Sequence, residues 1–282
     1  MTENSSEKME IDVEKVLRQR LGSKARFVPA FVVGAVKRLI CQDHLNYLMQ
    51  NNEGKQGAEF CHGVLSDMNV CFAVEGKENL PSPENTDVIY VSNHPLGGLD
   101  GLILIDFLSE YHGREVKFVV NDLLSAIKPM ERLFVPVNKH GAQGKEAVKK
   151  VNDTFAGDDP IVMFPAGLCS RQSSSGEIRD LEWQKMFVIK AIQSGRTVIP
   201  LYFSGHNSSF FYKFARWRAK LGLRFNFEMM LLPREMVGGE GKTYTIHVGK
   251  PIAPDSLKGD TPLSVAQDIR RLVYKLNPDA TP

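Results

Sequence analysis

Apolar residues follow two different spacings along the chain, and the change between them falls near residue 64. Before it, apolar residues recur at helical spacing over about 12–21 and, after a Gly22-Ser23 break, from Arg26 to about Gln50. Basic side chains accompany both apolar faces: Arg18, Arg20, Lys24, Arg26, Lys37 and Arg38. This combination is typical of a helix pair lying on a membrane surface, and a helical hairpin packed on its own domain is the alternative.

From residue 64 onward, short apolar runs alternate with stretches of helical spacing. The expected strands cover Val70–Val74, Asp87–Ser92, Val116–Val120, Leu133–Val137, Ile161–Phe164, Val198–Phe203 and Thr243–Val248. The expected helices cover about 101–112, 143–156, 181–194 and 262–276. We therefore predict an α/β fold with a largely parallel or mixed sheet flanked by helices. In this prediction residues 1–63 form N-terminal amphipathic helices and residues 64–282 form the α/β domain.

The composition is that of a globular protein without a metal or nucleic-acid site. The chain has 282 residues, 43% of them hydrophobic and 24% charged, enough for one large α/β domain. A formal net charge of +2 argues against nucleic acid as a partner. The four cysteines match no zinc spacing and are too few to staple such a chain, so we interpret them as reduced thiols. Six histidines have no carboxylate or cysteine at metal-ligand spacing, so we interpret them as structural or surface residues and expect no metal: His44, His62, His112, His140, His206 and His247.

The N-terminal residues are polar and acidic, whereas a secretory signal needs a basic start and an apolar core. The longest charge-free apolar run, Phe27 to Val36, is shorter than the ~18 residues that span a bilayer. We therefore expect a cytoplasmic protein that lies on a membrane surface without crossing it.

A candidate catalytic loop, Ser92-Asn93-His94-Pro95-Leu96-Gly97-Gly98-Leu99-Asp100, joins a predicted strand to a predicted apolar helix. In open α/β sheets, catalytic groups collect at the carboxyl ends of strands. A histidine there can take a proton from an attacking hydroxyl, while a nearby carboxylate binds its other nitrogen and stabilises the imidazolium. We predict that His94 is the base and Asp100 its partner. Asn93, Gly97, Gly98 and, from a second turn, Gly167 would shape the loop and an oxyanion environment.

A second buried strand, Ile161–Phe164, ends in a Pro165-Ala166-Gly167 turn that leads to Ser170-Arg171. Arg171 is expected to bind an anionic head group or a donor phosphate, and a surface arginine is the alternative. Cys169 is the weaker nucleophile candidate, because His94 can activate an acceptor hydroxyl directly.

The two segments together resemble the glycerolipid acyltransferase superfamily, which includes 1-acylglycerol-3-phosphate acyltransferases. The family's first block is Asn-His, four residues and Asp; its third is Phe-Pro-Glu-Gly followed by Ser-Arg; its fourth is an apolar run ending in Val/Ile-Pro. The matching residues are Asn93-His94 to Asp100, Phe164-Pro165-Ala166-Gly167 with Ser170-Arg171, and Val198-Ile199-Pro200. The resemblance implies O-acyl transfer, with Phe164, Pro165, Ser170 and Arg171 at the substrate site. It also implies a thioester donor, carried by acyl carrier protein or coenzyme A, and no bound cofactor.

This chain departs from the family pattern at three places. Five residues instead of four separate His94 from Asp100, Ala166 replaces the family's glutamate, and the second block lacks its arginine. That block falls within 133–139, where Asn138 or Lys139 is the nearest polar substitute. In the family, the missing glutamate and arginine are associated with the glycerol phosphate acceptor, so another acceptor is expected.

The amino-acid sequences of the first and third blocks, together with Gly205-His206-Asn207-Ser208-Ser209, are similar to those of one branch of the family. This branch is described as hemolysin-like or as lyso-ornithine-lipid O-acyltransferases. It implies an N-(3-hydroxyacyl) amino acid as acceptor, a lyso-ornithine or lyso-glycine lipid. It also implies a bacterial enzyme on the inner face of the cytoplasmic membrane. The alternatives are a lysophosphatidate acyltransferase, a catalytically inactive lipid-binding protein and a hydrolase that releases fatty acid.

Residues 210–220 interleave aromatic and basic side chains. On a helix, this pattern suits a membrane interface, where rings sit at head-group depth and cations meet anionic lipid. The alternative is a helix whose aromatic residues fill the core while its basic residues face water.

Overall fold

The structure is a computed structural model that describes residues 10–15, 18, 22–120, 127–137, 144–223 and 225–278. Within these residues a seven-stranded sheet has the order β1-β9-β8-β2-β5-β3-β4. Its strands are β1 (Cys71–Glu75), β2 (Val88–Ser92), β3 (Lys117–Val120), β4 (Phe134–Pro136), β5 (Ile161–Met163), β8 (Thr197–Phe203) and β9 (Thr243–Val248). Neighbouring strands are parallel except β8 and β9, which are antiparallel. The predicted α/β fold with a largely parallel sheet is confirmed.

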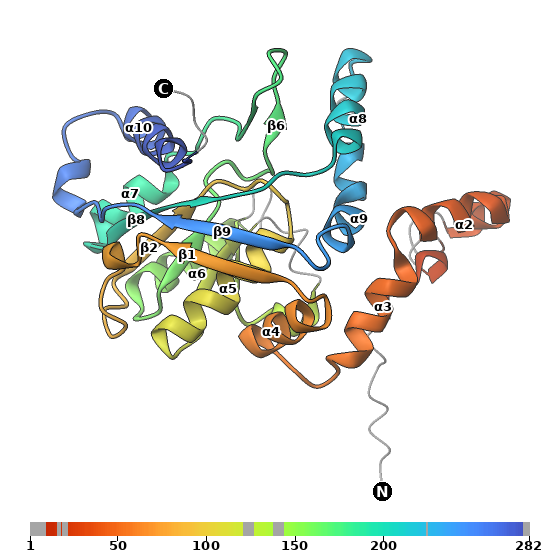
Figure 1. Cartoon of the computed structure of the whole chain (residues 1–282), viewed down its shortest axis with the longest axis horizontal. Coiled ribbons are helices and arrows are strands. Elements are labelled where there is room, and N and C mark those ends of the chain that lie inside the picture. The colour runs from red at the N-terminus through yellow and green to blue at the C-terminus, as the bar shows by residue number, and fades with distance from the viewer. Residues whose placement is uncertain are drawn as a thin grey trace, which may run out of the picture.

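Helices cover both faces of the sheet (Figure 1). The first face carries α4 (Gly57–Asp67) and α5 (Leu99–His112), and the second carries α6 (Gly144–Ala156), α7 (Met186–Ser194) and α10 (Pro262–Lys275). The central strand β2 is buried on both sides, with Val88 and Tyr90 facing the first layer and Ile89 and Val91 the second. Burial on both faces explains why this strand reads as a continuous apolar run instead of an alternating one.

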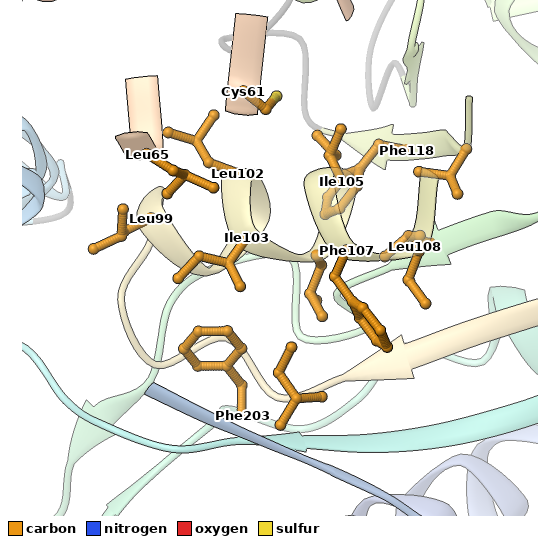
Figure 2. Close-up of a cluster of buried hydrophobic side chains, with 14 of the residues drawn as sticks. Cys61, Leu65, Leu99, Leu102, Ile103, Ile105, Phe107, Leu108, Phe118 and Phe203 are labelled. Carbon is orange, nitrogen blue, oxygen red and sulfur yellow. The ribbon is translucent and has the colours of Figure 1, made fainter. Parts of the chain in front are cut away.

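Helix α5 is apolar around most of its circumference because it lies between the sheet and α4. Figure 2 shows Ile103 and Phe107 on the side toward Phe203 of β8, and Leu102 on the side toward Leu65 of α4. The helix is therefore enclosed from both sides, which fixes the loop that precedes it.

The N-terminal region differs from the prediction in where its helices begin and end. A short 3-10 helix, η1 (Gly22–Phe27), covers the predicted Gly22-Ser23 break, and the apolar stretch after it contains two helices, α2 (Ala30–Leu39) and α3 (Gln42–Asn51). Cys41, with a φ of 52°, turns the chain between α2 and α3 through the left-handed region. Of the predicted helix over 12–21, Val13, Glu14, Lys15 and Arg18 are described as helical, and much of the rest lies outside the described residues.

Two further segments were not anticipated from the sequence. Helix α4 crosses the predicted boundary at residue 63, which itself stays a prediction. A small hairpin, β6 (Arg171–Gln172) and β7 (Ile178–Arg179), follows the third block, and α7 begins at residue 186 instead of 181. The delayed start leaves 181–185 outside the helix, where Trp183 is fully buried. In the described part of the chain, no helix is both long enough and apolar enough to cross a bilayer.

Candidate active site

The loop between β2 and α5 turns sharply at Gly97. This glycine has a φ of 77°, and a Cβ built on it would lie 2.7 Å from a methyl group of Leu232 and 3.2 Å from Cβ of Cys169. Both the backbone conformation and the lack of space therefore require glycine. Gly98 follows with an extended φ of −170° and caps α5, which places Asp100 in the first turn of the helix.

Asp100 is fully buried and holds the loop together through its carboxylate. Oδ2 accepts the N–H of Leu96 at 2.9 Å, and Oδ1 accepts the N–H groups of Gly98 at 3.1 Å and Gly101 at 3.0 Å. Oδ2 also lies 2.9 Å from Nδ1 of His94. An anion is favoured at a helix N-terminus, where main-chain N–H groups are otherwise unpaired. Such a carboxylate acts as an acceptor, so the imidazole proton belongs on Nδ1 and Nε2 is the basic nitrogen.

The imidazole of His94 stacks on Phe164, with ring centroids 3.9 Å apart and an angle of 18° between the rings. Phe164 in turn meets Phe118 edge to face at 5.2 Å. The His94 side chain is 12% exposed, and Nε2 has no hydrogen-bond partner among the residues that the structure describes. The ring is therefore fixed by Asp100 and Phe164 while its basic nitrogen stays open to a substrate.

The main chain of His94 is held by two residues from the segment after β5. Its N–H donates to Oδ1 of Asp180 at 3.2 Å. Its carbonyl accepts the N–H of Ser170 at 2.7 Å and lies 3.3 Å from the Ser170 hydroxyl. Ser170 was predicted at the substrate site, and in the structure it binds the main-chain carbonyl of His94.

Asp180 is the centre of this support, and no motif in the sequence marks it. Its buried carboxylate accepts the Ser170 hydroxyl at 2.6 Å and Nε1 of Trp183 at 2.9 Å, and its N–H donates to the hydroxyl of Tyr274 at 2.7 Å. Burial raises the pKa of Asp180, and the hydrogen bonds from Ser170 and Trp183 act in the opposite direction. These contacts join residues up to 94 positions apart, so no local pattern announces them.

The predicted oxyanion residues have other partners. The side-chain amide of Asn93 donates to the carbonyl of Phe203 at 2.9 Å and accepts its N–H at 2.7 Å, which ties the loop to the end of β8. The N–H of Gly98 serves Asp100, and the N–H of Gly167 donates to the carbonyl of Phe164 at 3.0 Å. The Asn93 side chain therefore links the loop to β8, and the N–H of Gly98 is already bound to Asp100.

Arg171 has partners that the sequence did not reveal. Its guanidinium donates to the carbonyl of Cys169 at 2.7 Å and pairs with the fully buried carboxylate of Glu228 at 3.1 Å. Glu228 also binds Arg218, with Nε to Oε2 at 3.0 Å. Two guanidinium groups and one carboxylate leave this buried cluster with one net positive charge.

The remaining candidate residues belong to the second and third sequence blocks. Pro165 is buried, and its carbonyl accepts the N–H of Gln184 at 2.9 Å. Cys169 is fully buried, and burial raises the pKa of its thiol to about 11, so it remains a thiol and is unsuited to nucleophilic attack. Asn138 and Lys139 lie outside the described residues.

A pocket of about 230 Å³ opens beside the loop, between Asn93 and Pro95 on one side and the chain after β8 on the other. Ser170, Ser204 and Tyr274 are among the residues that line it. Polar groups can therefore approach the loop from this side. Among the described residues, no group of His, Cys, Asp or Glu side chains is arranged to hold a metal ion.

A buried carboxylate that orients an open imidazole at the end of a parallel strand is the arrangement of a general-base enzyme. The acyltransferase family matches residues 15–277 of this chain, and the chain therefore belongs to that family. The enzyme class and the family predicted from the sequence blocks are confirmed.

Individual relatives make the likeness more specific. The lyso-glycine lipid O-acyltransferase of Phocaeicola vulgatus is 42% identical, over 94% of this chain and 95% of the relative. The lyso-glycine lipid O-acyltransferase of Bacteroides thetaiotaomicron is also 42% identical, over 94% of this chain and 97% of the relative. Among solved structures, the crystal structure of the 1-acyl-sn-glycerophosphate acyltransferase PlsC from Thermotoga maritima is 19% identical, with a TM-score of 0.44, and covers 95% of this chain and 98% of that chain.

Proposed function

We propose that this acyltransferase transfers a fatty acyl group from a thioester to the hydroxyl of a lyso-glycine lipid, an N-(3-hydroxyacyl) amino acid. The observation that carries the proposal is the His94–Asp100 pair, with Nε2 open to the acceptor. The 42% identity to two lyso-glycine lipid O-acyltransferases over nearly the whole chain supports this acceptor class. The departures at Ala166 and in the second block point the same way, since they remove groups associated with glycerol phosphate.

In the proposed mechanism, Nε2 of His94 takes the proton of the acceptor hydroxyl as its oxygen attacks the thioester carbonyl. The new C–O bond forms a tetrahedral intermediate, and its collapse breaks the C–S bond. The imidazolium then returns the proton to the leaving thiolate, which departs as a thiol. Asp100 stabilises the imidazolium between these steps, because its carboxylate lies 2.9 Å from Nδ1 in a buried setting.

We propose that Arg171 attracts the carboxylate of the acceptor through the net charge of its cluster. Arg171, Arg218 and Glu228 together carry one positive charge, which matches one carboxylate better than a phosphomonoester dianion. Asn138 and Lys139 stay proposed substrate contacts. The donor is acyl carrier protein or acyl coenzyme A, both of which present the same thioester.

We further propose that the enzyme works on the inner face of the cytoplasmic membrane and contacts it through residues 1–63. Phe27 of η1 and Phe31 of α2 have exposed fractions of 71% and 78%, and the guanidinium of Arg26 lies 4.8 Å from the centre of the Phe27 ring. Exposed rings next to cations suit the boundary between lipid head groups and acyl chains.

The direct test is acyl transfer by the purified protein, with acyl coenzyme A and acyl carrier protein offered separately as donors. We expect glycine lipid, identified by mass spectrometry, to form from lyso-glycine lipid faster than lyso-ornithine lipid or lysophosphatidate is acylated. The His94→Ala variant is the blank. Equal rates with lysophosphatidate would refute the acceptor, release of free fatty acid would indicate a hydrolase, and an unconsumed thioester would indicate a binding protein.

A genetic test names the product independently. A bacterial strain lacking this protein should lose glycine lipid and accumulate its lyso form in total lipid extracts. Restoration by the wild-type gene, but not by the His94→Ala gene, would link the lipid to the proposed base. Unchanged lipid extracts would contradict the proposal.

A further inference from the structure

Large apolar side chains gather on the surface formed by α8 (Ser209–Lys220), the loop after it and η5 (Phe227–Leu231). We define the α8–η5 surface by its exposed members, Phe210, Trp217, Leu221, Leu223, Phe225, Phe227 and Met230. These are seven of the fourteen large hydrophobic side chains that are exposed in the described part of the chain, within 21 consecutive positions. Such a concentration marks an interaction site, because single exposed apolar residues are normally scattered.

Three aromatic residues of α8 form a stripe, in which Phe210 and Trp217 are exposed and Phe214 is partly buried against the cluster of Phe211 and Leu231. Phe210, Phe214 and Trp217 follow helical spacing, and their rings stack with centroids 6.2 and 6.0 Å apart. The buried face of the helix is made by Phe211, Tyr212 and Ala215. The alternative that the aromatic residues of 210–220 fill the core therefore holds for Phe211 and Tyr212 and in part for Phe214, but not for Phe210 and Trp217.

Positive charge accompanies this stripe. Lys213 and Lys220 are exposed and Arg216 is partly exposed. The sequence from 204 to 234 contains six basic residues and a single acidic one, Glu228. Glu228 is fully buried and already bound to Arg171 and Arg218, so its negative charge does not offset the exposed lysines.

Ion pairs join the α8–η5 surface to the chain segment next to the candidate active site. The Arg171–Glu228–Arg218 cluster ties η5 and α8 to the segment that carries Ser170. Leu232, at the start of α9 (Leu232–Val237), contacts the Gly97 turn of the catalytic loop. Leu39, at the end of α2, packs against the same cluster of Phe211 and Leu231. Figure 1 shows α8 extending beyond the edge of the sheet, above α9.

We infer that the α8–η5 surface docks on an anionic lipid bilayer and presents the catalytic loop to lipid substrates. The inference rests on the proposed function in one respect, namely that the donor and the acceptor each carry a fatty acyl chain. Rings insert at head-group depth while Lys213, Arg216 and Lys220 meet lipid phosphates. Contact through α9 with the Gly97 turn gives the apolar chains a short route from the bilayer to His94.

Vesicle co-sedimentation of the full-length protein tests the docking. We expect stronger binding to phosphatidylcholine vesicles containing 30% phosphatidylglycerol than to pure phosphatidylcholine. The Trp217→Ser, Leu221→Ser variant should bind both kinds of vesicle at least about tenfold more weakly than wild type. Replacing Lys213 and Lys220 by Gln should cost about fivefold per residue, and on the anionic vesicles alone.

Helix α10 offers a matched control. Leu263 and Leu272 are each 47% exposed, close to the 56% of Trp217 and 55% of Leu221. The Leu263→Ser, Leu272→Ser variant should bind both kinds of vesicle within about twofold of wild type. It loses exposed apolar side chains as the Trp217→Ser, Leu221→Ser variant does, but outside the α8–η5 surface. Equal losses in the two serine variants would overturn the inference.

Tryptophan fluorescence gives a second readout, because the chain has two tryptophans and Trp183 is fully buried. On vesicles, emission from Trp217 should shift to shorter wavelength and be quenched by brominated acyl chains. Unchanged quenching by aqueous acrylamide at saturating vesicles would overturn the inference. So would a monomer–dimer shift abolished by the serine substitutions without loss of vesicle binding, which would assign the surface to a second copy of the chain.

The outcome for the α8–η5 surface is separable from the outcome for the proposed function. Vesicle binding that depends on Trp217 and Leu221, without any acyl transfer, would support the surface and refute the function. Acyl transfer combined with wild-type vesicle binding by the serine variant would do the reverse. With a water-soluble, short-chain acceptor and donor, the serine variant should keep its turnover within about twofold, since its substitutions lie on the surface.

Discussion

Helix α5 has a histidine near each end, and the two differ in how many ring nitrogens are occupied. His94, in the loop before α5, binds Asp100 through Nδ1 and has no partner for Nε2 among the described residues. His112, the last residue of α5, lies 2.7 Å from the carbonyl of Pro83 through Nδ1 and 2.8 Å from the hydroxyl of Tyr90 through Nε2. Both rings are nearly buried, so burial does not distinguish them.

The difference shows what separates a proposed catalytic histidine from a structural one in this fold. The carbonyl of Pro83 requires a proton on Nδ1 of His112, and Nε2 then accepts the hydroxyl proton of Tyr90. Burial raises the pKa of Tyr90, so this hydroxyl stays protonated. His112 therefore has no lone pair left for a substrate, whereas His94 keeps one at Nε2.

The largest effect is expected at His94. Replacing it by alanine should lower kcat by about 10³-fold, because a positioned general base contributes roughly 10²–10⁴-fold. The free energy of unfolding, measured by urea titration, should fall by about 1–2 kcal/mol, because the stacking on Phe164 is lost while the buried Asp100 carboxylate keeps three N–H donors. Residual activity above a tenth of wild type, or a collapse of stability, would remove the contrast with His112.

The second effect is expected at Asp180, which fixes the peptide unit of His94. In Asp180→Ala, the Ser170 hydroxyl, the Trp183 indole N–H and the His94 N–H all lose their acceptor. We expect kcat to fall by about 10- to 100-fold while KM changes by less than about threefold, since a displaced base affects the chemical step.

Trp183→Phe is the matched control for Asp180. It removes the hydrogen bond to Oδ2 of Asp180 and leaves those from Ser170 and His94. It should lower the free energy of unfolding, but it should lower kcat less than the Asp180 variant does. If both variants lower kcat and raise KM in parallel with their loss of stability, Asp180 is a packing residue and does not position His94.

The sequence predicted those parts of the molecule that depend on neighbouring residues. The continuous apolar run of β2, the glycine turn and the His94–Asp100 pair all lie within fourteen positions, and the structure brings that pair together. The role of Asp180 could not be predicted, because the residues that link it to His94 and Tyr274 are 86 and 94 positions away and a lone aspartate after a short hairpin has no distinctive pattern. The pairing of Arg171 with Glu228 spans 57 positions and escaped for the same reason.

The same limit applied to His112. It was set aside as structural because no carboxylate or cysteine lay at ligand spacing, and its actual partners are 22 and 29 positions upstream. The sequence therefore distinguished a catalytic from a structural histidine only by the residues next to His94. The structure distinguishes them by the hydrogen bonds that each ring makes.

The third effect is a loss of stability without a loss of function at His112. Replacing it by phenylalanine keeps a ring of similar size but leaves the hydroxyl of Tyr90 and the carbonyl of Pro83 without partners. We expect the free energy of unfolding at pH 8 to fall by about 2 kcal/mol, the cost of buried polar groups left unpaired. Turnover at 20 °C should stay within about twofold of wild type; a loss comparable to that of His94→Ala would merge the two histidines into one site.

The smallest effect is the pH dependence of that stability difference. Burial lowers the pKa of His112 below its ordinary value of 6.5, while the hydrogen bond to Pro83 opposes the shift. Above pH 7 neither the folded nor the unfolded chain binds a proton at this position, so the difference between wild type and His112→Phe stays constant. Below pH 6.5 the unfolded wild-type chain takes up a proton that the folded chain refuses, which favours unfolding of the wild type alone.

Urea titrations of both proteins at pH 8.0, 6.5 and 5.5 measure this difference directly, because titrating groups common to both proteins cancel. The stability advantage of wild type over His112→Phe should shrink by up to about 1 kcal/mol between pH 8.0 and 5.5. An advantage that grows toward acid pH would mean that folded His112 gains a proton more readily than the unfolded chain. Its two nitrogens would then not be committed to Pro83 and Tyr90, and the distinction from His94 would fail.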